Sequence, residues 1–150
     1  MSQFKIKNKT SKIVLAILLL TSGAAKALEV SDYKGKVVYL DFWASWCEPC
    51  KLSFPWLNKM KSQNPDLVVI GVNLDKEESL AKEFLKESPA NFEIIYDPEA
   101  KLAEKYNVGG MPYSIVFDKK GIKRLSHVGF TNAKGKVYEQ EIKKLLSESK

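Results

Sequence analysis

The 150-residue sequence contains only two cysteines and one histidine, and the cysteines lie close together at Cys47 and Cys50. A structural zinc site needs four nitrogen or sulfur ligands, whereas Cys47, Cys50 and His127 supply three. His127 has no evident partner in the sequence, and we assign it a structural role. Thiol chemistry is therefore confined to one place in this chain, and we expect neither a metal site nor a cofactor.

The N-terminal apolar segment is shorter than the roughly 20 residues that a helix needs to cross a bilayer. It runs from Ile13 to Leu20, follows four lysines and precedes Ala25-Lys26-Ala27. A basic region, a short apolar run and a small-residue site in this order are typical of a secretory signal peptide. We therefore predict export to the periplasm with residues 1–27 cleaved after Ala27; the alternative is an uncleaved membrane anchor.

The net charge of +6 comes mainly from this N-terminal segment, which has five lysines and no acidic residue. Without it, 19 basic and 18 acidic residues remain, a net charge of +1. A phosphate-binding surface needs a clustered surplus of cations, so we expect no nucleic-acid partner. Residues 28–150 contain no repeat and no Gly/Ser-rich linker, which predicts one domain.

Two apolar runs rich in β-branched residues, 37–43 and 67–74, predict strands that are buried on both faces. Between them, residues 50–61 show the apolar spacing of a helix, with the cysteines at its start and Pro55 expected to kink it. The apolar positions of this helix are Leu52, Trp56, Leu57 and Met60.

The rest of the chain continues to alternate between helices and strands, which indicates an α/β fold. The expected elements are a helix over residues 77–87 capped by Asp75, a strand over 92–96, a helix from Asp97 through Tyr106 with Pro98 in its first turn, a hairpin of residues 113–118 and 122–128, and a C-terminal helix. The expected apolar stripes are Leu80, Phe84 and Leu85 on the first of these helices and Tyr138, Ile142 and Leu145 on the last.

Cys47 and Cys50 lie two residues apart at the predicted start of a helix. The free N–H groups and the positive dipole end of a helix stabilise a thiolate at this position. Such a pair can attack a disulfide of another protein and then close to a disulfide itself, so we predict a redox-active dithiol. The alternative is an inert disulfide, although a bridge across so short a loop contributes little stability.

Two sequence motifs resemble the signatures of the thioredoxin superfamily. They are Asp41-Phe42-Trp43-Ala44-Ser45-Trp46-Cys47-Glu48-Pro49-Cys50 and Val108-Gly109-Gly110-Met111-Pro112. The segments 35–38 and 118–121, and the helix and strand between Asp75 and Asp97, are more similar to the exported TlpA/ResA branch. The resemblance implies a thioredoxin-like fold, with a central mixed sheet flanked by helices and a helix and strand inserted centrally.

The sequence departs from this family pattern in two places. Only residues 28–33 are available for the β-hairpin that commonly precedes the Gly-Lys-Val strand, so we expect a shortened N-terminal hairpin. Gly71 stands where cytosolic thioredoxin carries a lysine beside its buried aspartate, so any electrostatic role of that lysine is absent.

The resemblance also implies roles for the residues of the site. Cys47 would be the exposed nucleophile and Cys50 the resolving thiol, joined as a Cys47–Cys50 disulfide when oxidised. Asp41 would be buried and exchange a proton with Cys50, the alternative being a partly hydrated strand end. Pro112 would be a cis-proline that leaves the Met111 backbone open for pairing with an extended substrate segment.

Three residues around the cysteines are expected to modulate this chemistry. Glu48 and Pro49 occupy the positions between the cysteines, where the negative charge of Glu48 opposes thiolate formation and favours a reductant. If Glu48 points into water, however, its effect is screened. Trp46 is expected to present exposed apolar surface for docking, whereas Trp43 and Phe42 belong to the core.

These features predict a monomeric periplasmic thiol–disulfide oxidoreductase that reduces disulfides in exported proteins. The resemblance implies apocytochrome c as one class of substrate and a membrane protein as electron donor. An oxidase or isomerase of the same fold is the alternative among enzymes. Outside enzymes, the alternatives are a module that binds copper(I) through the two thiolates and a protein-binding domain with incidental cysteines.

Overall fold

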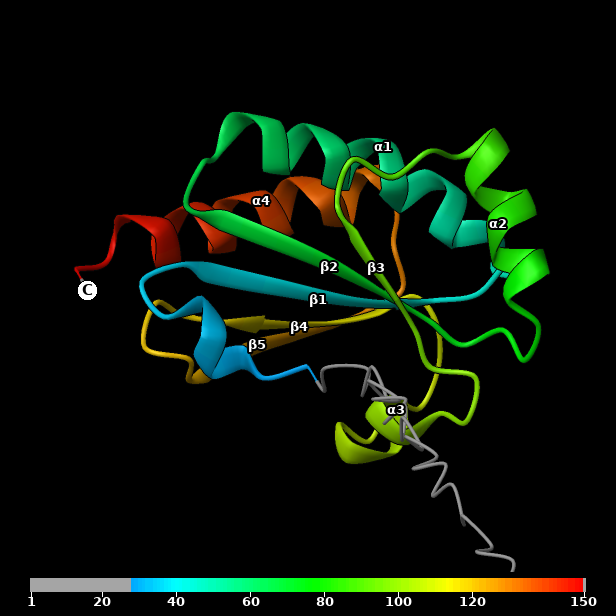
Figure 1. The fold of residues 1–150 in the computed structure, drawn as a ribbon. Helices are drawn as coiled ribbons and strands as arrows, with labels where there is room; N and C mark the ends of the chain where they lie inside the picture. The colour runs from blue at the N-terminus through cyan, green and yellow to red at the C-terminus, as the bar shows by residue number, and fades with distance from the viewer. Residues whose placement is uncertain (1–27, 150) are drawn as a thin grey trace, which may run out of the picture.

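A five-stranded mixed sheet forms the centre of the computed structural model, which describes residues 28–149 (Figure 1). In spatial order the strands are β3 (Glu93–Tyr96), β2 (Leu67–Asn73), β1 (Val37–Trp43), β4 (Tyr113–Phe117) and β5 (Lys123–Val128). β1, β2 and β3 are parallel to one another, whereas β4 is antiparallel to both β1 and β5. The predicted mixed sheet is confirmed, and β1 is its central strand.

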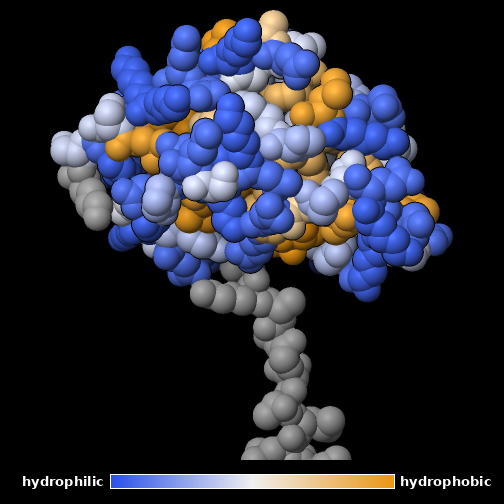
Figure 2. All heavy atoms as spheres, turned by 90° about the horizontal axis from the view of Figure 1, so that it is seen from above, coloured by the Kyte–Doolittle hydropathy of each residue, from blue (hydrophilic) through white to orange (hydrophobic). Residues whose placement is uncertain are grey.

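Helices cover both faces of the sheet. α1 (Glu48–Gln63) and α4 (Asn132–Ser147) lie on one face, with α2 (Glu78–Glu87) beside the beginning of α1 (Figure 1). The short helix α3 (Lys101–Lys105) and the 3₁₀ helix η1 (Val30–Tyr33) lie on the opposite face. Seen from the side of α1 and α4, the outer surface is largely hydrophilic with scattered apolar patches, as expected for amphipathic helices (Figure 2).

The continuous apolar sequence of β1 follows from this layered arrangement. All seven of its residues are buried, and alternate side chains enter two different apolar clusters. Tyr39 and Trp43 face α1 and α4, whereas Leu40 and Phe42 face α3 and η1. Because side chains alternate along a strand, Asp41 lies on the α1 face together with Tyr39 and Trp43.

The helix that carries the cysteines extends further than predicted. α1 begins at Glu48, with Cys47 as its N-cap residue, and continues through Pro55 to Gln63. Leu57 and Met60 are buried as expected, but Leu52 is exposed.

The predictions for α2 and α3 need more correction. Glu77 occupies the N-cap of α2 without a side-chain hydrogen bond, and the exposed Leu80 is replaced in the buried stripe by Ala81. α3 begins only at Lys101, so Pro98 precedes the helix. Asp97 still serves the start of α3, because its carboxylate accepts hydrogen bonds from the backbone N–H groups of the second and third helical residues.

No strand precedes β1 in residues 28–149, where η1 takes the place of the expected shortened hairpin. Val30 and Tyr33 of η1 pack against the apolar cluster on the α3 face. The predicted signal peptide, residues 1–27, lies outside the described part of the chain. Within that part, no helix has both the length and the apolar character needed to span a membrane.

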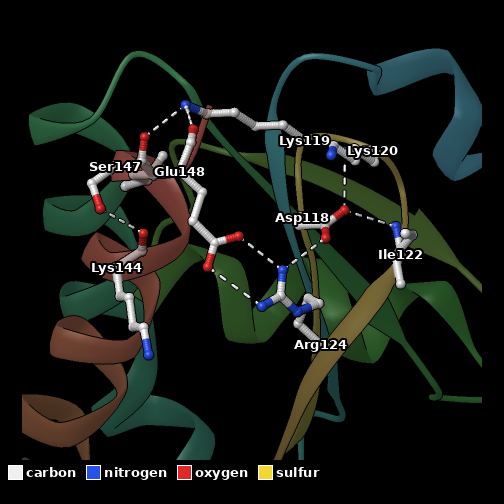
Figure 3. A network of polar contacts seen from close by, with 9 residues as sticks. Asp118, Lys119, Lys120, Ile122, Arg124, Lys144, Ser147 and Glu148 are labelled. Atoms are coloured by element: carbon white, nitrogen blue, oxygen red, sulfur yellow. Dashed lines mark hydrogen bonds and ion pairs between the residues drawn. The ribbon is translucent and has the colours of Figure 1, made fainter. Parts of the chain in front are cut away.

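A polar network ties the β4–β5 turn to the end of α4 (Figure 3). Arg124 donates hydrogen bonds to Asp118 at 3.0 Å and to Glu148 at 2.8 Å. Lys119 donates to the backbone carbonyl groups of Leu146 and Glu148, which satisfies acceptors that the end of a helix leaves open. The network lies at the end of the sheet away from the cysteines, and we assign it a structural role.

Gly71 of β2 is required by close packing. A Cβ atom there would lie 2.9 Å from Ile94 Cδ1, 3.0 Å from Trp43 Nε1 and 3.1 Å from Phe92 Cε2. The two rings are rigid and buried, so they cannot move aside without disturbing the core.

We predict that Gly71→Ala lowers the free energy of unfolding by about 1–3 kcal/mol, because the added methyl group overpacks the core. Gly109→Ala is the matched control, since no atom lies within 4 Å of a Cβ atom at that position. Urea denaturation of both variants measures the difference. Equal stability of the two variants would contradict this account of Gly71.

Candidate active site

Cys47 and Cys50 form a disulfide at the junction of the loop after β1 and the start of α1. Their Cα atoms are 5.4 Å apart, and the Cys50 N–H donates to the Cys47 carbonyl oxygen. Cys47 is 3% exposed and Cys50 is fully buried. The expectation of an exposed Cys47 is therefore wrong for the disulfide state, although Cys47 remains the more accessible of the two.

The position of the pair favours thiolate chemistry once the disulfide is reduced. Cys47 is the N-cap residue of α1, where the first N–H groups of the helix have no partner within the helix. These groups and the helix dipole stabilise a negative charge on the Cys47 sulfur more than on Cys50, which lies inside the first turn. The geometry therefore supports Cys47 as the attacking sulfur.

Two of the predicted substrate-contacting features have the expected form. Trp46, next to Cys47, is 71% exposed. The Met111–Pro112 peptide bond is cis, and Met111 packs against the apolar cluster that contains Cys47 and Cys50. The structure thus brings the two sequence motifs to the same site, while their role in binding substrate stays a prediction.

Glu48 and Pro49 form the first turn of α1. The Glu48 side chain is 84% exposed and lies 3.5 Å from the Lys51 ammonium group. Solvent and this ion pair both weaken its influence on Cys47. The proposed tuning by Glu48 stays a prediction, and the geometry favours a small effect.

Asp41 lies in the middle of β1 and is only 2% exposed, so it is not a hydrated strand end. Its Oδ2 atom has no hydrogen-bond partner within the described residues. Burial raises the pKa of Asp41 from 3.8 to about 8, because the charged form loses its hydration. Asp41 therefore holds a proton at neutral pH, on the face of β1 that lies beneath α1.

The sequence analysis missed a polar anchor for the loop before Cys47. Asp75, just after β2, accepts hydrogen bonds from the Ser45 backbone N–H at 2.9 Å and from the Ser45 hydroxyl at 2.8 Å. Asn73 donates a third bond to the Asp75 carboxylate at 2.8 Å. Asp75 therefore does not cap α2 but fixes the backbone two residues before Cys47. The signal in the sequence was its place after a parallel strand, where ligand and active-site groups gather.

His127 has partners that the sequence did not reveal. Its Nε2 atom lies 2.9 Å from the Glu141 carboxylate, and its ring stacks on Tyr138 with centroids 3.7 Å apart. The region from residue 28 to 149 contains no group of three or more His, Cys, Asp or Glu side chains that could hold a metal ion.

Comparison with known proteins gives the family. The model of the AhpC/TSA family matches residues 10–125. The chain belongs to this family. A solved structure of a thioredoxin-like superfamily protein aligns with a TM-score of 0.70 at 24% identity, over 84% of this chain and 90% of that one. The fold of this AhpC/TSA-family chain is therefore thioredoxin-like.

Several relatives of this AhpC/TSA-family chain carry names that refer to thiol–disulfide chemistry. Thiol-disulfide oxidoreductase ResA of Bacillus cereus is 33% identical over 69% of this chain and 61% of its own length. ResA of Bacillus subtilis is 34% identical over 64% of this chain and 55% of its own length. The chain therefore spans about three fifths of the length of these relatives. A crystal structure from Chlorobium tepidum, provisionally named thiol:disulfide interchange protein DsbE, has a TM-score of 0.77 at 43% identity, covering 80% of this chain and 86% of that one.

We predict that Asp75→Ala lowers the free energy of unfolding by roughly 2–4 kcal/mol, because it leaves the buried Asn73 amide and the half-buried Ser45 backbone N–H without their acceptor. Ser45→Ala is the matched control, since it removes one hydroxyl and keeps the backbone N–H bond to Asp75. The Ser45 amide should also exchange its hydrogen faster in Asp75→Ala. Equal losses in the two variants would contradict the anchoring role.

The raised pKa of Asp41 predicts a pH-dependent stability. Between about pH 4 and pH 8 the folded protein keeps the Asp41 proton and the unfolded chain does not, so stability falls as the pH rises. The slope is at most ~1.4 kcal/mol per pH unit. Asp41→Asn lacks this proton, so its stability relative to the parent protein should increase from pH 4 to pH 8. Urea denaturation across this range measures the stability of both proteins. If the two stabilities changed with pH in the same way, the raised pKa of Asp41 would be contradicted.

Proposed function

We propose that this protein is an exported thiol–disulfide oxidoreductase that reduces disulfides of other exported proteins. The observation that carries the proposal is the Cys47–Cys50 disulfide at the start of α1, on the side of the sheet that holds a buried, protonated Asp41. The names of the ResA and DsbE relatives support the same chemistry.

The reaction follows from the positions of the two sulfurs. The Cys47 thiolate attacks a disulfide of the substrate protein, forms a mixed disulfide and releases one substrate thiolate. Cys50 then attacks the Cys47 sulfur, which releases the second substrate thiolate and closes the Cys47–Cys50 bond. The substrate gains two electrons, and the enzyme pair loses two.

Asp41 serves the second of these steps. Cys50 is a nucleophile only after its thiol loses a proton, and a carboxylate with a pKa of about 8 is well matched to a thiol of ordinary pKa. The ionised form of Asp41 accepts the Cys50 proton, and Asp41 ends the cycle protonated, which is its state in the disulfide form at neutral pH.

The proposed reductive direction requires a supply of electrons. After each turnover the Cys47–Cys50 disulfide must be reduced by a dithiol donor, which we propose is a membrane protein. Apocytochrome c is one proposed substrate, and the protein is proposed to act as a periplasmic monomer without a cofactor.

The proposal is tested by trapping. Cys50→Ala removes the resolving thiol, so Cys47 should accumulate mixed disulfides with substrate proteins in a periplasmic extract. Cys47→Ala is the matched control and should trap none, because Cys50 is buried. Non-reducing electrophoresis followed by mass spectrometry measures the adducts.

Trapping, together with two further measurements, separates the alternatives. No Cys47-dependent adducts, together with no reduction of insulin by the parent protein, would contradict the oxidoreductase. A reduction potential near the −120 mV of strong periplasmic oxidants would keep the chemistry and overturn the reductive direction.

A further inference from the structure

A row of small and polar residues crosses the sheet at the level of Asp41. The strand register pairs Asp41 with Gly71 of β2 on one side and with Ser114 of β4 on the other, and it pairs Ser114 with His127 of β5. Directly opposed residues point to the same face with Cβ atoms about 4.5–5.5 Å apart. Asp41, Ser114 and His127 therefore lie side by side on the face that α1 and α4 cover.

The β2 side of this row has no space for another side chain. A Cβ atom at Gly71 would already lie 3.0 Å from Trp43 Nε1 and 3.1 Å from Phe92 Cε2. A lysine at this position, as in cytosolic thioredoxin, has no room beside Asp41. Within the row, the polar side chains next to Asp41 are therefore those on the β4 and β5 side, Ser114 and His127.

On the β4 side the polar groups continue to the surface. The Ser114 hydroxyl shares a 2.7 Å hydrogen bond with the Tyr39 hydroxyl and lies 3.5 Å from His127 Nδ1. His127 Nε2 lies 2.9 Å from Glu141 Oε2. Ser114 and His127 are buried, whereas the Glu141 side chain is 38% exposed. The series begins at a fully buried carboxyl group and ends at one in contact with solvent.

The His127 ring is suited to pass a proton along this series. It is fixed by stacking on Tyr138, with ring planes within 9° of parallel. Burial lowers the pKa of His127, and the facing Glu141 carboxylate opposes that shift. The ionisable groups that face it are Tyr39 from β1 and Tyr138 and Glu141 from α4. A neutral imidazole accepts a proton at one nitrogen while it releases one at the other.

We propose that Ser114, His127 and Glu141 form the route by which Asp41 exchanges its proton with solvent, an inference that rests on the role of Asp41 proposed above. Before Cys50 attacks, the resting proton of Asp41 passes to the Ser114 oxygen as the Ser114 hydroxyl proton moves to His127 Nδ1. The Nε2 proton then moves to the Glu141 carboxylate and from there to water. Asp41 is then ionised and accepts the Cys50 proton, so it is protonated both before and after the step, and one proton has passed from Cys50 to solvent overall.

The test measures the resolving step in single-turnover reduction of insulin, with purified reduced protein in normal and in deuterated water. Ser114→Ala and His127→Phe should each slow this step about tenfold at pH 7. This is a smaller effect than loss of the acid–base group Asp41 itself, which should slow the step roughly 10²-fold or more. His127→Phe keeps an aromatic ring against Tyr138, and Glu141→Gln changes only the surface end of the route. The solvent isotope effect should rise in all three variants.

Glu139→Gln is the matched control, because Glu139 also lies on α4 but pairs with Lys143. It should leave both the rate and the isotope effect unchanged. The initial attack by Cys47, measured as its alkylation rate, should also be unchanged in every variant.

Combination with Asp41→Asn separates this proposal from the proposed function. If the route acts through Asp41, its variants cause no further slowing in the Asp41→Asn background. Two results would overturn the route alone. One is that the route variants slow the reaction equally in the parent protein and in Asp41→Asn. The other is that all three route variants react at full speed while Asp41→Asn is slow. Full speed of Asp41→Asn itself overturns both the role of Asp41 and the route, but it leaves the cysteine chemistry to the trapping experiment.

Discussion

One carboxyl group buried in the central strand is the constraint on which the site depends. Asp41 lies between Leu40 and Phe42 in a strand whose side chains are all buried. An ionised carboxylate without a partner is too costly to bury, so Asp41 keeps its proton, and its unpaired oxygen still costs about 1–3 kcal/mol. Packing alone would favour an apolar residue at this position. Acids with a pKa shifted in this way cluster at functional sites.

The rest of the site is arranged around this group. β1 places Asp41 beneath α1 and ends just before the loop that carries Cys47, and Asp75, just after β2, fixes that loop. Gly71 closes one side of Asp41, while Ser114 adjoins it on the other. The oxidised cysteine pair is nearly buried, and we propose that substrates reach it at Cys47, the more accessible sulfur, beside the exposed Trp46.

Local patterns in the sequence predicted much of the fold, but contacts between distant residues stayed hidden. The buried strands β1 and β2 and the cysteine pair at the start of α1 follow from residue type and spacing. The role of Asp75 did not, because a carboxylate ahead of a helix is as typical of a cap as of an anchor to Ser45, thirty residues earlier. The partners of His127 depend on how β4, β5 and α4 pack, which no local pattern encodes.

The most direct test of this account is the titration of Asp41 itself in the oxidised protein. Carbon-13 NMR of a protein labelled at the aspartate carboxyl carbons, with Asp41→Asn to assign the signal, measures its protonation as the pH changes. The account predicts a midpoint near pH 8. A midpoint near pH 4, the ordinary range of aspartate, would show that Asp41 is ionised at neutral pH and would contradict the central claim.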